Sequence, residues 1–167
     1  MKILDFGCGN KKIKGAIGID VNRNTEADVI ADLNHFPYPL RDSSFDLIIC
    51  DNILEHLNDL IKVMEELHRI AKPGAKIVIK APYFRSTGAF QDPTHRTFIT
   101  EKTFDYFLED SSYNFYTKAR FRIRKIEYKW GKNTKIKLLR FILGDRIVRD
   151  MVTNACWGIE FELEVVK

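Results

Sequence analysis

The chain has 167 residues, a net charge of +4 and 45% hydrophobic residues, which suits one globular domain with a sizeable core. No apolar run approaches the roughly 20 residues that a membrane helix needs, and the start lacks a signal-peptide pattern. The three cysteines are odd in number and lack metal-ligand spacing. We therefore expect a cytoplasmic protein without stable membrane insertion.

Five short strands separated by turns are predicted in the first half of the chain. Their apolar runs lack clean alternation, which is typical of strands covered on both faces in a parallel sheet. The predicted strands are residues 2–5, 16–21, 28–32, 45–50 and 76–81. The first two connections are too short for ordinary helical crossovers. We therefore expect an α/β sheet with some helices shortened or missing.

Residues 57–71 form the clearest predicted helix. Their apolar side chains fall on one stripe at helical spacing. Asn58 or Asp59 can cap the start of this helix, and the Lys-Pro-Gly of residues 72–74 ends it. The chain then turns into the fifth predicted strand, which gives a right-handed strand–helix–strand unit.

The second half of the chain predicts a different set of elements. Residues 100–108 look helical, and residues 119–130 alternate with a phase shift at Lys125 that predicts a bulge. Residues 134–152 form a basic amphipathic stretch of one or two helices. Residues 157–166 alternate again and are expected to form an antiparallel last strand.

Positive charge is concentrated in residues 118–149, which hold twelve Lys and Arg against only two acidic residues. A segment of this kind predicts an anionic partner such as nucleic acid, a phosphorylated substrate or a membrane face. The alternative is an apolar stripe packed on the sheet beneath a solvated basic face.

Polar residues follow three of the predicted strands directly. Gly7 and Gly9 come after the first strand, where glycine allows a tight turn and close approach of a ligand. Asp20 and Asp32 end the second and third strands, where carboxylates can bind a ribose diol and an adenine amine. Ligands of open parallel sheets bind beyond these strand ends. Either aspartate alone could equally be a solvated turn residue, but together with the glycine turn they predict an adenosine site.

Several motifs, taken in order, resemble the class I S-adenosylmethionine-dependent methyltransferases. The motifs are Leu4-Asp5-Phe6-Gly7-Cys8-Gly9, Gly18-Ile19-Asp20, Ala31-Asp32-Leu33 and residues 45–50, with Leu54-Glu55-His56-Leu57 and residues 69–75 resembling the type 11 branch. The resemblance implies a single Rossmann-like methyltransferase domain over residues 1–167, with a mostly parallel twisted sheet. It also implies S-adenosylmethionine as the cofactor.

The same resemblance implies roles for individual residues. The glycine turn would wrap the methionine part of the cofactor, and the strand-end residues would hold its ribose and adenine. The implied cofactor-binding residues are Asp5, Gly7, Cys8 and Gly9 around the methionine, Asp20 and Val21 at the ribose and adenine, Asp32 and Leu33 at the adenine, Asp51 and Asn52 at the methionine end, and His56 at the mouth. Lys11 stands where the family usually has a third glycine, which indicates a shortened loop.

The polar segment 83–100 is long for a loop inside a compact domain, and such segments are usually functional or disordered. Its Asp-Pro-Thr-His stretch resembles that of type 11 members, many of which modify glycans or small metabolites. By this analogy His95 is the candidate general base or substrate-orienting residue, with Asp92 and Arg96 as substrate-side partners. The alternative is a hydrogen-bonded loop histidine.

We therefore expect a methyltransferase that acts on an oxygen or nitrogen of a small molecule or glycan. Residues 83–117 are expected to form a substrate or lid segment, and residues 131–152 a basic helical insertion. The alternatives are an RNA methyltransferase that uses residues 118–149 and a non-catalytic cofactor-binding subunit. Either the loop or a second copy in a homodimer must exclude water from the site. The histidines are too scattered for a recognisable metal motif, so no metal is expected.

Overall fold

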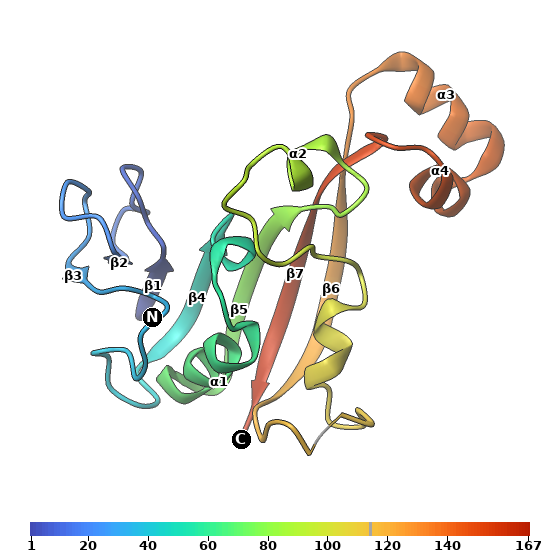
Figure 1. The fold of residues 1–167 in the computed structure, drawn as a ribbon. Helices are drawn as coiled ribbons and strands as arrows, with labels where there is room; N and C mark the ends of the chain where they lie inside the picture. Colours follow the sequence, from blue (N-terminus) through green and yellow to red (C-terminus); the bar gives the residue numbers. More distant parts are fainter. Residues whose placement is uncertain (114) are drawn as a thin grey trace.

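The computed structural model describes residues 1–113 and 115–167, which build a seven-stranded sheet in the order β3-β2-β1-β4-β5-β7-β6 (Figure 1). The strands are β1 (Ile3–Phe6), β2 (Ile17–Asp20), β3 (Val29–Ile30), β4 (Phe45–Asp51), β5 (Ala71–Pro82), β6 (Arg120–Trp130) and β7 (Cys156–Val166). Strands β1 to β5 pair in parallel, and β7 is antiparallel to both β5 and β6. The expected α/β class, a mostly parallel sheet with an antiparallel C-terminal strand, is confirmed.

The centre of the sheet lies between β1 and β4. Leu4, Phe6, Ile48 and Cys50 on these strands are fully buried, which explains why their sequences lack alternation. The chain leaves β1 toward β2 and β3 on one side and then crosses back to β4 on the other. Strand order therefore reverses here, and the crevice at the carboxyl ends of β1 and β4 is the place where such sheets bind ligands.

Helices are sparse, as expected from the short connections. No helix lies between β1 and β3 among the described residues. The predicted helix of residues 57–71 is present in shorter form as α1 (Leu60–Ile70), and a separate 3-10 turn, η1 (Leu54–His56), precedes it. Asp59 caps α1, because its side chain accepts a hydrogen bond from the Lys62 backbone N–H at 3.0 Å. The start of the helix is therefore one of the two positions that the sequence indicated.

Strand pairing refines two further predictions. The register of β6 and β7 shifts between Ile123 and Lys125, which confirms the predicted bulge. β5 begins earlier than predicted, because Ala71 already pairs with Phe45 of β4. The register of the two strands is irregular after this pair, and Gly74 follows with φ +73°. The predicted helix of residues 100–108 is a 3-10 helix, η2 (Thr103–Phe107), and the segment before it contains one short helix, α2 (Thr87–Phe90).

Two helices, α3 (Thr134–Leu143) and α4 (Asp145–Met151), project from the ends of β6 and β7 (Figure 1). Gly144 separates them at φ +82°. Val148 is their one buried residue, whereas several large apolar side chains are exposed: Leu138, Phe141, Ile142, Leu143, Ile147 and Met151. In the part of the chain that the structure describes, no helix combines the length and apolar character needed to cross a membrane.

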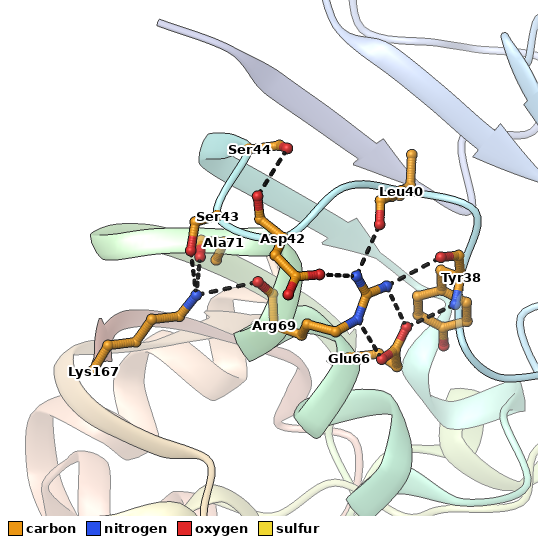
Figure 2. A network of polar contacts seen from close by, with 9 residues as sticks. All are labelled: Tyr38, Leu40, Asp42, Ser43, Ser44, Glu66, Arg69, Ala71 and Lys167. Carbon is orange, nitrogen blue, oxygen red and sulfur yellow. Dashed lines mark hydrogen bonds and ion pairs between the residues drawn. The ribbon is translucent and has the colours of Figure 1, made fainter.

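A polar network lies at the amino ends of β4 and β5, at the opposite end of the strands from the ligand crevice (Figure 2). The Arg69 guanidinium donates to both carboxylate oxygens of Glu66, at 2.7 and 2.8 Å, and to the Asp42 carboxylate. It also donates to the backbone carbonyls of Leu40 and Tyr38, at 2.9 and 3.0 Å. Because one planar cation satisfies several acceptors, the loop before β4 is fixed to α1.

Candidate active site

The turn after β1 is held by backbone and carboxylate contacts. Gly7 and Gly9 have φ of +75° and +50°, values that favour glycine. The Gly9 N–H donates to Asp20 Oδ2 at 2.8 Å, and the Ile13 N–H donates to Asp5 Oδ2 at 2.7 Å. Buried Asp5 thus stabilises the turn, and its role toward the methionine part of the cofactor stays a prediction.

A cavity of about 160 Å³, here called the nucleoside cavity, lies beside this turn at the ends of β2 and β3. Carboxylates stand at its edges and apolar side chains form its walls. Its lining residues are Asp20, Val21, Asp32, Leu33, Asn34, Ile53, His56 and Leu57. Such a combination suits a flat base with polar edges joined to a ribose diol.

Asp32 is ready to act as an acceptor at this cavity. Its Oδ1 accepts from the Asn34 backbone N–H at 2.9 Å, and its Oδ2 lies 2.8 Å from His35 Nδ1. The Asn34 N–H in particular lowers the pKa of Asp32 below its ordinary value. The carboxylate therefore stays ionised near neutral pH and can accept a hydrogen bond from an amine.

A second cavity of about 380 Å³, the histidine pocket, joins segments that are far apart in the sequence. It lies between η1, the loop after β5 and the start of β7. Its lining residues are Asn52, Glu55, His56, Pro82, Ser86, Gly88, Gln91, Asp92, His95, Asn154 and Trp157. His56 lines this pocket and the nucleoside cavity alike, so the two meet at its side chain.

Two histidines stand together in this pocket. The rings of His56 and His95 meet edge to face, with centroids 4.7 Å apart and an interplanar angle of 71°. His56 Nδ1 lies 2.8 Å from Thr94 Oγ1, and His95 Nδ1 lies 2.8 Å from the Ala89 carbonyl oxygen. Burial lowers the pKa of His56, and the neighbouring His95 adds to this effect. His56 is therefore neutral near pH 7.

Glu55 lies close to the two histidines and is 2% exposed. Neither of its carboxylate oxygens has a hydrogen-bond partner among the described residues. Burial raises the pKa of Glu55 to about 7, because removing a carboxylate from water disfavours its charged form. A buried, unpartnered carboxyl group is uncommon and marks this pocket as a functional site.

The structure places the predicted site residues in different surroundings. Asp92 lines the histidine pocket beside His95, but Arg96 is exposed and lines neither cavity. Arg96 instead gives its backbone N–H to the Glu55 carbonyl at 2.6 Å. Cys8 is buried against β2, since a Cβ added at Gly18 would lie 2.8 Å from the Cys8 sulfur. Neither residue lines the nucleoside cavity or the histidine pocket.

Asp51 and Asn52, which were also predicted, lie beside the histidine pocket and a neighbouring cavity. Asn52 lines the histidine pocket with φ +52°, and its side chain donates to Asp51 Oδ1 at 2.7 Å. Asp51 faces a neighbouring cavity of about 390 Å³ and forms an ion pair with Lys80 at 2.8 Å. Asp51 and Asn52 thus stand at the carboxyl end of β4, where the methionine end of the cofactor was expected.

Glu55, Asn154 and Trp157 are among the pocket residues that were not predicted. Glu55 has one signal in the sequence, a carboxylate set between the apolar residues of a Leu-Glu-His-Leu run. Asn154 and Trp157 have none, because the antiparallel pairing of β7 with β5 brings them to the pocket from the far end of the chain.

The arginines of the basic segment are largely engaged within the protein. Arg122 pairs with Glu109 and Glu164, and Arg124 also pairs with Glu164. Arg140 pairs with Asp145, and Arg149 with Asp150. These contacts favour a solvated basic face, but the expected packing of an apolar stripe on the sheet is wrong for α3, none of whose apolar side chains is buried. A nucleic-acid partner stays a prediction.

This strand order, with a glycine turn after β1 and acids at the ends of β2 and β3, defines a Rossmann-like nucleoside-binding α/β protein. Residues 4–79 match the family model described as "Methyltransferase domain". Residues 4–79 therefore carry the sequence pattern of the S-adenosylmethionine-dependent methyltransferases, a family whose cofactor is S-adenosylmethionine.

Comparisons with individual proteins agree with this assignment. The chain is 33% identical over 90 residues to an uncharacterised protein of Methanocaldococcus jannaschii, a match that covers 46% of this chain and 39% of that protein. It is 36% identical over 72 residues to norajmaline N-methyltransferase of Rauvolfia serpentina, covering 41% of this chain and 24% of that enzyme. These matches span well under half of either relative's length.

A solved structure shows the same fold over nearly the whole chain. This is a SAM-dependent methyltransferase from Archaeoglobus fulgidus, with a TM-score of 0.68 and 20% sequence identity, covering 98% of this chain and 85% of that one. The residues present here also fit the cofactor. A Cβ at Gly9 would meet nothing within 4 Å, which leaves open space beside the turn for the methionine part.

Proposed function

We propose that the protein transfers a methyl group to an oxygen or nitrogen of a small molecule or glycan bound in the histidine pocket. The observation that carries this proposal is that His56 lines both cavities. A nucleoside held on one side and an acceptor held on the other therefore meet at one point, which is the arrangement that methyl transfer needs.

His95 is the catalytic residue of this proposal. Its Nδ1–H is held by the Ala89 carbonyl, so Nε2 keeps a lone pair. Bound S-adenosylmethionine supplies an electrophilic methyl group on a sulfonium sulfur. The lone pair of the acceptor atom forms the new bond to that carbon as the carbon–sulfur bond breaks, and His95 Nε2 takes the acceptor's proton.

The histidine pocket supports an acceptor of limited size. Its volume of about 380 Å³ suits a sugar or small heterocycle rather than a polymer. Gln91, Asp92 and Asn154 in its walls offer hydrogen bonds to hydroxyl groups, and the half-exposed Trp157 offers an apolar surface for a ring. The similarity to norajmaline N-methyltransferase also favours a small-molecule acceptor.

The test combines cofactor binding with a methyl-transfer screen over sugars, glycans, small amines and RNA. His95→Ala is expected to bind S-adenosylmethionine as tightly as the wild type in calorimetry, yet to lose about 10²–10⁴-fold in turnover. His68→Gln is the matched control, since His68 lies outside both cavities. Full turnover in His95→Ala would remove the catalytic role. Cofactor binding without methylation of any acceptor would favour the non-catalytic subunit.

A further inference from the structure

Glu55, His56 and His95 form a group whose chemistry extends beyond a single proton acceptor. One ligand atom from each side chain lies within 4.8 Å of those of the other two. Both carboxylate oxygens of Glu55 are buried without a protein partner among the described residues. Burying a carboxylate without a compensating partner costs free energy. We therefore expect a ligand to bind the Glu55 carboxylate.

The hydrogen bonds behind the two rings decide which nitrogens are free. His95 Nδ1 faces a carbonyl, which only accepts, so Nδ1 carries the proton. Thr94 Oγ1 gives its own hydrogen to Asp92 Oδ1 at 2.7 Å and therefore accepts from His56 Nδ1. Each ring thus keeps its lone pair on Nε2, the form in which histidine binds a metal ion.

We propose that Glu55, His56 and His95 bind one divalent transition-metal ion, through a carboxylate oxygen and the two Nε2 atoms. Two histidines and one carboxylate are a ligand set used by zinc and other first-row ions. The contacts from Ala89 and from Thr94 and Asp92 are those that orient metal-binding histidines. To reach ion–ligand distances of about 2.0–2.2 Å, the three side chains close in by roughly 1 Å.

Three protein ligands leave at least one open position on the ion, on the side of the histidine pocket. This step rests on the proposed function: the open position takes an oxygen of the acceptor. In the ion-bound protein His95 Nε2 is a ligand and does not take the acceptor's proton, which is its role in the ion-free protein. The coordinated hydroxyl, made more acidic by the ion, releases its proton to water instead. The oxygen then receives the methyl group. The ion-bound protein therefore favours hydroxyl acceptors.

Calorimetry with ZnCl₂ and visible absorption with Co²⁺ test the site directly, on chelator-stripped full-length protein without a polyhistidine tag. We expect about one ion per chain. Glu55→Gln and His95→Ala are expected to weaken binding at least about tenfold, and Thr94→Val about tenfold, because it removes the partner of His56 Nδ1. His68→Gln, which changes a histidine outside the group, is expected to bind like the wild type.

Cysteine thiols do not compete with the proposed site for the added metal ions, because Cys8, Cys50 and Cys156 are all buried. Thermal unfolding without metal checks that each variant folds. If the wild type takes up neither ion, or if folded Glu55→Gln, His95→Ala and Thr94→Val all bind as it does, the metal site is refuted.

Activity distinguishes this inference from the proposed function. Turnover on a hydroxyl acceptor that falls after chelation and returns with Zn²⁺ or Co²⁺ supports activation by the ion. Turnover unchanged by chelation overturns that activation while leaving the methyltransferase intact. Ion uptake by a chain that binds S-adenosylmethionine but methylates nothing supports the metal site and counts against the proposed function.

Discussion

The carboxylate of Asp20 accepts the backbone N–H of Gly9 at 2.8 Å, which joins the end of β2 to the turn after β1. The same side chain lines the nucleoside cavity. One carboxylate therefore shapes the turn expected to hold the methionine part of the cofactor and faces the space expected for its ribose.

Asp20→Ala removes both contacts at once. We expect its affinity for S-adenosylmethionine to fall about 10–100-fold, since a hydrogen bond to a charged group contributes about 1.5–3 kcal/mol. Isothermal calorimetry measures this loss. Glu26→Ala is the control, because Glu26 is exposed nearby and touches the turn through its backbone N–H only. Equal affinities for the two variants would contradict the role of Asp20.

The two glycines of the turn are expected to respond differently to alanine. A Cβ at Gly7 would lie 2.5 Å from Ile53 Cγ1, whereas a Cβ at Gly9 would meet nothing within 4 Å. We expect Gly7→Ala to destabilise the protein by about 2–4 kcal/mol, from left-handed backbone strain plus overpacking, and Gly9→Ala by about 1–2 kcal/mol from strain alone. Urea unfolding compares them, and a smaller loss for Gly7→Ala would be inconsistent with this packing.

Arg69→Met tests the network of Figure 2. The substitution keeps an apolar stem but removes the guanidinium donors from two backbone carbonyls and from the Glu66 carboxylate, which keeps only the Tyr38 N–H. Because these groups are partly buried, we expect a loss of about 2–4 kcal/mol in the free energy of unfolding. Arg69→Lys should recover only part of it, since an ammonium cannot donate in a planar fork. The neighbouring exposed Arg41→Met serves as control and should be nearly neutral.

The environment of His68 leads us to expect that the free energy of unfolding depends on pH. Its Nε2–H donates to the Val166 carbonyl at 2.7 Å, and burial lowers the pKa of the imidazole, with Lys167 and Arg120 adding to this effect. Below an unfolded-state pKa of about 6.5 the unfolded chain binds a proton that the folded protein resists. Stability should therefore fall as the pH drops below that value.

His68→Gln removes this titration while keeping a side-chain donor. Urea unfolding from pH 5 to 8 should give the variant a shallower decline of stability below pH 6.5 than the wild type. Parallel curves for the two proteins would show that His68 does not contribute.

Much of the fold was predictable because its signals are local. Apolar runs that end in glycine or aspartate marked β1 to β4, and the stripe of α1 with Asp59 before it marked the helix. For these residues, burial in a strand or capping of a helix can be inferred from the sequence immediately around them. The phase shift at Lys125 likewise reported the bulge, because one inserted residue reverses which side chains face the core.

The rest depends on pairing between distant segments. Nothing local to Asn154 and Trp157 shows that β7 inserts between β5 and β6 and carries them to the histidine pocket. The grouping of Glu55 with His95 depends on how the loop after β5 folds back over η1. The early start of β5 at Ala71 was also missed, because a Lys-Pro-Gly run usually signals a turn.

The helices α3 and α4 stand between β6 and β7 and lie directly before Asn154 and Trp157 in the chain. The nucleoside cavity is built within residues 20–57, whereas the histidine pocket draws on residues 82–95 and 154–157 and shares His56 with it. Insertions or drift in α3 and α4 can shift Asn154 and Trp157 without disturbing the cofactor side. Under the proposed function, the acceptor specificity can therefore change while the site for the methyl donor stays the same.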